Sequence, residues 1–285
     1  MKIELYKSRT LSERFSATAD FVQENWKLYL KNVCYIGIPL GLLMGYFMHR
    51  YMIDVFSNIN VYSPMGPPAI NWGIYSLTML TSALFSLFIC ALTGSILYNY
   101  AKETLSENTT FSELKEKIFP FMGKMLLLGL IFLIVIAVFS FLFGDLVTSL
   151  ALSGKTALVG IITLFFVLLF FALLIVFLPF LLLLYCPIFF DNASIWQALK
   201  KSMRLGFKYW ASTFGTGLLG ILLVMVTSYI IVAPYWVYIM FNMDGGGIFG
   251  YLLAMLIPLA SLILTPIIYV FMGFQYTSII KKEEE

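Results

Sequence analysis

Six long apolar segments run through the chain, and none of them contains Asp, Glu, Lys, Arg or His. A helix needs about 20 apolar residues to cross the hydrocarbon core of a membrane. A water-soluble fold is excluded, because a chain of 285 residues has too little polar surface left to cover six helices that are apolar all round. The pattern therefore predicts an all-α integral membrane protein with six transmembrane helices, at 33–48, 72–98, 125–143, 157–185, 209–238 and 248–276.

The basic residues alternate between the two sides of these segments. Sixteen of the eighteen Lys and Arg residues precede the first segment, follow the second or fourth, or lie at the C-terminus, and only Arg50 and Lys155 lie on the other side. Short loops rich in Lys and Arg stay in the cytoplasm. We therefore expect a multi-pass protein of a bacterial inner membrane with both termini cytoplasmic. A cysteine at position 192 should resist impermeant labels applied to intact cells.

The domain organisation is expected to be a single membrane domain. It would contain a cytoplasmic amphipathic segment, a six-span bundle and a charged cytoplasmic tail, over residues 1–31, 32–276 and 277–285. No cleavable signal peptide is expected, because the first apolar run begins only at about Val33.

A weak internal repeat relates the segments that precede the first, third and fifth spans. One gapless alignment places Phe111 and Lys115 on Trp196 and Lys200, and a second places Phe15 on Trp196. The chain would then consist of three units, each a cytoplasmic amphipathic helix followed by a helical hairpin.

The clearest of these segments is residues 194–210. On a helical wheel its apolar face comprises Ile195, Trp196, Leu199, Met203 and Phe207, and its basic face comprises Lys200, Lys201, Arg204 and Lys208. Asp191 or Asn192 is expected to cap the helix, since a short polar side chain can accept from the first free backbone amides. A helix of this kind lies in the headgroup layer, so Trp196 and the four basic residues are candidate contacts for anionic lipid headgroups.

Three glycines recur at four-residue spacing in the first span, at Gly37, Gly41 and Gly45. Such a row lets another helix backbone approach closely. The partner helix can belong to the same chain or to a second copy in a homo-oligomer, and the sequence leaves both open.

The residues that catalysis would need are missing from the spans. Proton relays, pumps and voltage sensors keep ionisable groups at membrane depth. The one histidine, His49, is expected to be solvated at the interface, and one His with scattered carboxylates does not form a typical metal site. Cys34, Cys90 and Cys186 are expected to be buried thiols. Residues 153–156 read SGKT but lack the earlier glycine of a phosphate-binding loop. We predict no enzyme activity, catalytic residue, metal or cofactor.

Residues 184–222 carry a further pattern, in which a proline ends a span, a polar turn follows, and an Ala-Leu-basic-Ser helix leads to an aromatic residue and a new span. The matching residues are Pro187, Asp191, Ala198, Leu199, Lys201, Ser202 and Trp210. This order resembles that of multi-span bacterial membrane proteins related to the membrane domain of glycerophosphodiester phosphodiesterases. The resemblance implies a membrane domain of unknown activity, because the phosphodiesterase chemistry of the fused members lies in a separate soluble barrel. No catalytic residue is carried over.

Together these features favour a non-enzymatic scaffold or lipid-interacting membrane protein. The alternative is a transporter or channel for neutral or amphiphilic cargo, with a membrane-embedded enzyme less favoured. The net charge of +3 comes from Lys and Arg next to the membrane, so the expected partners are the bilayer and its anionic headgroups rather than nucleic acid. A second copy or another membrane protein is a further candidate partner.

Overall fold

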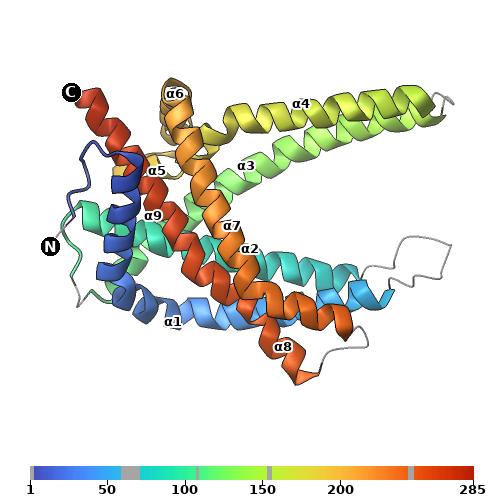
Figure 1. The fold of residues 1–285 in the computed structure, drawn as a ribbon, viewed down its shortest axis with the longest axis horizontal. Coiled ribbons are helices and arrows are strands. Elements are labelled where there is room, and N and C mark those ends of the chain that lie inside the picture. Colours follow the sequence, from blue (N-terminus) through green and yellow to red (C-terminus); the bar gives the residue numbers. More distant parts are fainter. Residues whose placement is uncertain (1–2, 59–70, 107–108, 153–155, 243–246) are drawn as a thin grey trace. The chain divides into compact units, whose positions relative to one another are not determined.

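The structure is a computed structural model that describes residues 3–58, 71–106, 109–152, 156–242 and 247–285. Every helix or strand assigned in these ranges is an α-helix, which confirms the all-α class. The helices, drawn in Figure 1, are α1 (Leu11–Asn58), α2 (Trp72–Ala101), α3 (Phe111–Leu152), α4 (Thr156–Leu183), α5 (Cys186–Asp191), α6 (Ile195–Lys208), α7 (Trp210–Phe241), α8 (Ile248–Ala254) and α9 (Leu256–Glu284).

Six stretches of the described chain are long and apolar enough to cross a membrane. They are Leu11–Phe56, Trp72–Ala101, Phe111–Phe141, Val159–Asp191, Trp210–Phe241 and Ile248–Glu284. Each overlaps one predicted span, and six helices of this length and composition indicate a multi-pass membrane protein.

Helices continue across two of the predicted segment boundaries. The amphipathic N-terminal segment is not separate, because α1 continues from Leu11 into the first span, although Figure 1 shows that its first turns run at an angle to the rest. The expected tail is part of α9, in which Thr277, Ser278 and Ile279 are buried. Polar residues end an apolar run without ending a helix, so these helices extend beyond the apolar segments.

The contacts divide the chain into two compact units. Unit 1 combines Met1–Met122 with Thr216–Glu285, and unit 2 comprises Gly123–Gly215.

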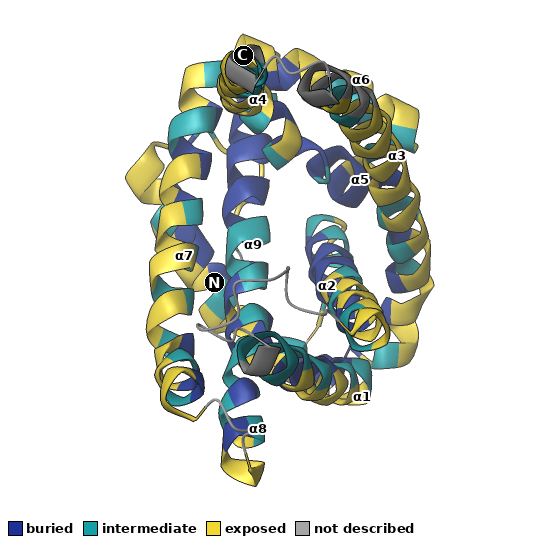
Figure 2. Cartoon of the chain, turned by 90° about the vertical axis from the view of Figure 1, so that its right-hand side faces the viewer, coloured by how far each residue is buried: buried dark blue, intermediate teal, exposed yellow. Residues whose placement is uncertain are grey.

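In unit 1, α1 packs against α2, α8 and α9. Large side chains such as Phe85, Phe88 and Phe274 are fully buried there, and Figure 2 shows buried residues along α9. His49 belongs to this interior: it is buried, and its Nδ1 lies 3.4 Å from the hydroxyl of Tyr235. The prediction of a solvated interfacial histidine is therefore wrong, because α1 turns this side chain towards α7.

Both ends of the chain meet at one end of unit 1. The backbone amide of Arg9 donates to Ser278 Oγ of α9 at 3.0 Å, and the amide of Ile3 donates to the hydroxyl of Tyr100 in the last turn of α2 at 2.7 Å. The N-terminal segment and the last turns of α2 and α9 thus lie together.

The Arg9 side chain fixes the N-terminal segment. Its guanidinium donates to the carbonyls of Leu5, at 2.9 Å, and of Glu4, and it lies 5.0 Å from the centre of the Phe274 ring. Burial lowers the pKa of this guanidinium, and the nearby Glu4 carboxylate opposes part of the shift.

Unit 2 contains a long apolar hairpin whose surface is largely uncovered. The most apolar part of α4 has no buried residue, and side chains such as Phe165 and Leu168 are exposed along it. The part of α3 in this unit exposes Leu133 and Ile136 in the same way. Helices that are apolar and exposed all round require a hydrocarbon environment, which lipid supplies.

The cysteines are only partly as predicted. Cys90 and Cys186 are buried free thiols, whereas Cys34 is exposed on the surface of α1. The prediction for Cys34 is therefore wrong.

Candidate functional site

The local structure at the start of α6 differs from the prediction. Ser194 caps the helix: its Oγ accepts from the amide of Gln197 at 3.4 Å, and the Gln197 side chain accepts from the Ser194 amide at 3.0 Å. Asp191 and Asn192, the predicted caps, end the preceding helix instead, and Asn192 adopts a left-handed conformation with φ of 51°. The reason is Pro187, whose fixed φ favours the first turn of a helix, so the short α5 takes up these residues.

Three small residues and one leucine form the face by which α6 packs within unit 2. Ala198, Ser202, Leu205 and Gly206 are buried. A Cβ on Gly206 would lie 2.9 Å from the backbone N and Cα of Phe180 in α4, so the two helix backbones are in close contact.

A hydrogen bond reinforces this packing. Pro187 has no N–H and cannot bond the carbonyl four residues earlier, that of Leu183. Ser202 Oγ donates to this carbonyl at 3.2 Å. The hydroxyl of α6 therefore satisfies the acceptor that the proline leaves open at the end of α4.

The predicted apolar face of α6 divides into two parts. Ile195 and Leu199 are half-buried against Phe180 and Leu184. Trp196, Met203 and Phe207 are exposed, at 65%, 42% and 44% of their surface. This second strip of large apolar side chains requires a lipid or protein surface to cover it.

The four basic side chains of α6 differ in their contacts. Lys201 is half-buried, and its Nζ lies 2.7 Å from Asp191 Oδ2. Lys200 is exposed, with its Nζ 5.6 Å from the centre of the Trp196 ring, and Arg204 and Lys208 are also exposed. The structure thus exposes Lys200, Arg204 and Lys208 on the surface of α6, with Lys200 next to Trp196, and pairs Lys201 with Asp191.

Sequence reasoning missed Lys124 near this site. Its Nζ donates to the side-chain oxygen of Asn192 at 2.9 Å and to the carbonyls of Asn192 and Ala193 at 3.2 and 3.0 Å. A cation here complements the partial negative charge at the end of α5. The cluster fixes the turn from which α6 begins.

The glycine row of the first span packs inside unit 1. A Cβ on Gly41 would lie 3.2 Å from Phe85 Cε2 and 3.3 Å from Pro258 Cβ, and one on Gly45 would lie 2.6 Å from Met255 Cε. Gly37 faces Phe88 of α2. All three glycines therefore have close neighbours within the chain.

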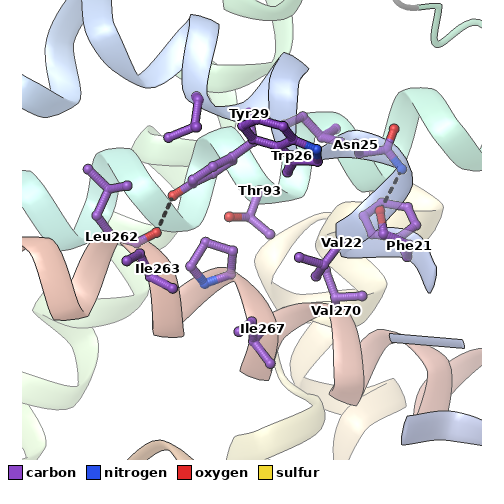
Figure 3. Close-up of a pocket in the computed structure, with 13 residues that line it drawn as sticks. Phe21, Val22, Asn25, Trp26, Tyr29, Thr93, Leu262, Ile263, Ile267 and Val270 are labelled. Atoms are coloured by element: carbon purple, nitrogen blue, oxygen red, sulfur yellow. Dashed lines mark hydrogen bonds between the residues drawn. The ribbon is translucent and has the colours of Figure 1, made fainter. Parts of the chain in front are cut away.

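Unit 1 also contains an apolar pocket between α1, α2 and α9, shown in Figure 3, with a volume of about 180 Å³. Its lining includes Tyr29, Thr93 and Pro266. No predicted site residue lines this pocket, because no helix pattern indicates which side chains from distant segments meet. In the ranges that the structure describes, no group of three His, Cys, Asp or Glu side chains has the arrangement of a metal site.

Comparison of the chain with protein-family models, with curated proteins and with solved structures finds no significant match. The resemblance of residues 184–222 to membrane domains related to glycerophosphodiester phosphodiesterases therefore stays a prediction.

Proposed function

We propose that this chain is a non-enzymatic multi-pass protein of a bacterial inner membrane that acts as a scaffold or lipid-interacting component. In this proposal α6 lies in the headgroup layer, and its exposed residues Trp196, Lys200, Arg204 and Lys208 contact anionic lipids.

One observation carries the proposal: the exposed surface of α6 combines large apolar side chains with basic ones, while a separate face holds the helix to the protein. Ser202 and Gly206 bind it to α4. Trp196, Met203 and Phe207 are left exposed beside the basic residues. Amphipathic helices that lie in a membrane interface have this composition, with Trp and Phe in the acyl boundary and Lys and Arg among the headgroups.

Both termini are proposed to be cytoplasmic. The distribution of Lys and Arg supports this orientation. The hydrogen bonds of Arg9 to Ser278 and of Ile3 to Tyr100 support it too, because they require the N-terminal segment to lie on the same side as the ends of α2 and α9.

The threefold repeat is part of the proposal, in a register different from that of the sequence alignment. Helices α1, α3 and α6 each begin after a Thr or Ser that bonds with a Glu or Gln three residues later, in the pairs Thr10 and Glu13, Thr110 and Glu113, and Ser194 and Gln197. When the three helices are aligned on these pairs, buried residues coincide at three positions of the alignment. These are Arg14, Leu114 and Ala198 at the first, Thr18, Ile118 and Ser202 at the second, and Phe21, Phe121 and Leu205 at the third. This register places Phe111 on Ile195 instead of Trp196.

The proposal is tested by purifying the full chain with its native lipids and identifying the bound molecules by mass spectrometry. We expect anionic phospholipids to be enriched several-fold over the same membrane extract, because each Lys or Arg near the surface contributes about 1 kcal/mol. A control for the loss of one positive charge is the Lys201→Gln variant of the full chain. It should retain the enrichment, since Lys201 pairs with Asp191. A defined non-lipid molecule at constant stoichiometry, without lipid enrichment, would instead favour the transport of cargo.

A further inference from the structure

A second pocket adjoins the one in Figure 3. It lies between α1, α7 and α9 of unit 1 and has a volume of about 480 Å³. The two pockets share Val22, Trp26 and Ile267 as lining residues. The two pockets are therefore neighbours along α1 and α9, and they are called here the α1–α9 groove. Its larger part falls in the size range typical of small-molecule sites.

The α1–α9 groove is built around a proline. Pro266 has no N–H, so the carbonyl of Leu262, four residues earlier in α9, has no donor within the helix. The hydroxyl of Tyr29 in α1 donates to this carbonyl at 3.0 Å, as the dashed line in Figure 3 shows. The bond holds α1 at a fixed distance from α9 beside the pocket. The groove is therefore preformed.

Three polar side chains of the lining turn their donors to the backbone. Thr18 Oγ1 donates to the carbonyl of Arg14 at 2.8 Å, Asn25 Nδ2 to that of Phe21 at 2.9 Å, and Thr93 Oγ1 to that of Ile89 at 2.8 Å. Most of the other lining residues are apolar. Polar cargo would lose its hydrogen bonds to water in such a site without replacement. A hydrocarbon chain loses nothing of this kind and gains apolar contacts.

The edge of the α1–α9 groove has the character of a membrane interface. Trp26 lines both pockets and is 48% exposed, and the indole ring is typical of the boundary between acyl chains and headgroups. Lys27 is exposed, with its Nζ 5.9 Å from the centre of the Trp26 ring. Lys31, one turn further along α1, is also exposed. A phosphate beside Trp26 would therefore meet complementary positive charge.

We propose that the α1–α9 groove binds one acyl chain of a phospholipid, with the phosphate of that lipid next to Lys27. The apolar lining selects the hydrocarbon chain, and the Trp26 and Lys27 pair selects a phosphate-bearing headgroup. This inference rests on the membrane location in the proposed function and is independent of α6, which lies in unit 2.

The test uses the full chain in lipid nanodiscs that contain a phosphatidylcholine probe with a photoreactive group near the middle of one acyl chain. After irradiation, the labelled residues are mapped by mass spectrometry. We expect labelling to concentrate on residues 15–30 of α1 and 262–271 of α9, several-fold above the exposed apolar surface of α3 and α4.

Two variants fill the α1–α9 groove, Val22→Trp and Ile267→Trp. Each should lower labelling of the groove about tenfold or more, because Val22 and Ile267 line both pockets and an indole at either position would take up space in them. Val226→Trp is the matched control, since Val226 is exposed on α7 and does not line either pocket. It should leave groove labelling unchanged. The thermal midpoint of each variant reports its folding.

A second comparison tests the headgroup contact. Lys27→Gln should reduce groove labelling by the phospholipid probe about fivefold, the factor that corresponds to about 1 kcal/mol for one Lys near a membrane surface. Labelling by a diacylglycerol probe, which has no phosphate, should not change. Equal reductions for the two probes would overturn the phosphate assignment.

Uniform labelling of all lipid-facing helices in the wild-type chain overturns the proposal, even if both Trp variants fail to fold. Unchanged groove labelling in folded Val22→Trp also overturns it. If the photoreactive probe does not label the groove but the purified chain is still enriched in anionic lipids, the acyl-chain site is rejected and the proposed function stands. If the purified chain is not enriched in anionic lipids but the probe still labels the groove, the proposed role of α6 is rejected and the acyl-chain site is supported.

Discussion

Replacing Lys200, Arg204 and Lys208 by Gln is expected to weaken binding of a peptide of residues 194–210 to anionic vesicles about a hundredfold. Each cation near an anionic surface contributes about 1 kcal/mol, so three contribute about 3 kcal/mol. Vesicle titration measures the change, followed by the fluorescence of Trp196 and Trp210, and Trp210 alone reports binding of a peptide that lacks Trp196. The difference should shrink strongly near 1 M salt, where the screening length falls to about 3 Å.

Two controls separate charge from hydrophobic contact in this experiment. The Trp196→Ala peptide should bind neutral and anionic vesicles more weakly by a similar factor, because it loses apolar area and no charge. Binding of the unchanged peptide to neutral and anionic vesicles with equal affinity would mean that the basic residues serve orientation in the membrane and not lipid recognition.

The second large effect concerns the packing of α6 on α4. Gly206→Ala is expected to destabilise the protein by about 1–3 kcal/mol, since the new Cβ would lie 2.9 Å from the backbone of Phe180, which cannot move independently of α4. The free energy of unfolding in mixed detergent measures the loss. Gly215→Ala is the matched control. A Cβ there has no neighbour within 4 Å, so the change should stabilise the α7 helix by about 0.5–1 kcal/mol.

Opposite signs for these two Gly→Ala changes would support the close contact between α6 and α4. A Gly206→Ala protein as stable as the Gly215→Ala protein would contradict it.

The six spans could be predicted from the sequence, because hydrocarbon thickness sets the length of an apolar helix. The helix of residues 195–208 could also be predicted from its alternating faces. Its cap could not be predicted, since Asp191, Asn192 and Ser194 are all good caps and only the intervening α5 selects Ser194.

Sequence alone could not show which face of α6 packs against the protein. The apolar periodicity draws attention to Trp196 and Phe207, whereas small residues such as Ser202 and Gly206 make the close contact. Small side chains give a weak hydrophobic signal even where they permit the tightest packing.

The α1–α9 groove was also beyond sequence reasoning. Pro266 identifies Leu262 as a carbonyl without a helical donor, but its donor, Tyr29, lies 233 residues away in the chain. The burial of His49 has the same cause, because Tyr235 reaches it from α7. Contacts of this kind depend on the tertiary fold and leave no local pattern.

The central claim is that α6 lies in the membrane interface with one face in lipid. Spin labels placed singly at positions 196, 203 and 207, and at 200, 204 and 208, test it in the reconstituted full chain with the native cysteines replaced by Ser. Collisions with oxygen, which concentrates in lipid, and with a water-soluble nickel complex report the surroundings of each label. We predict high oxygen accessibility at the first three positions and high nickel accessibility at the other three. Equal nickel accessibility at all six positions would place α6 in water and contradict the account.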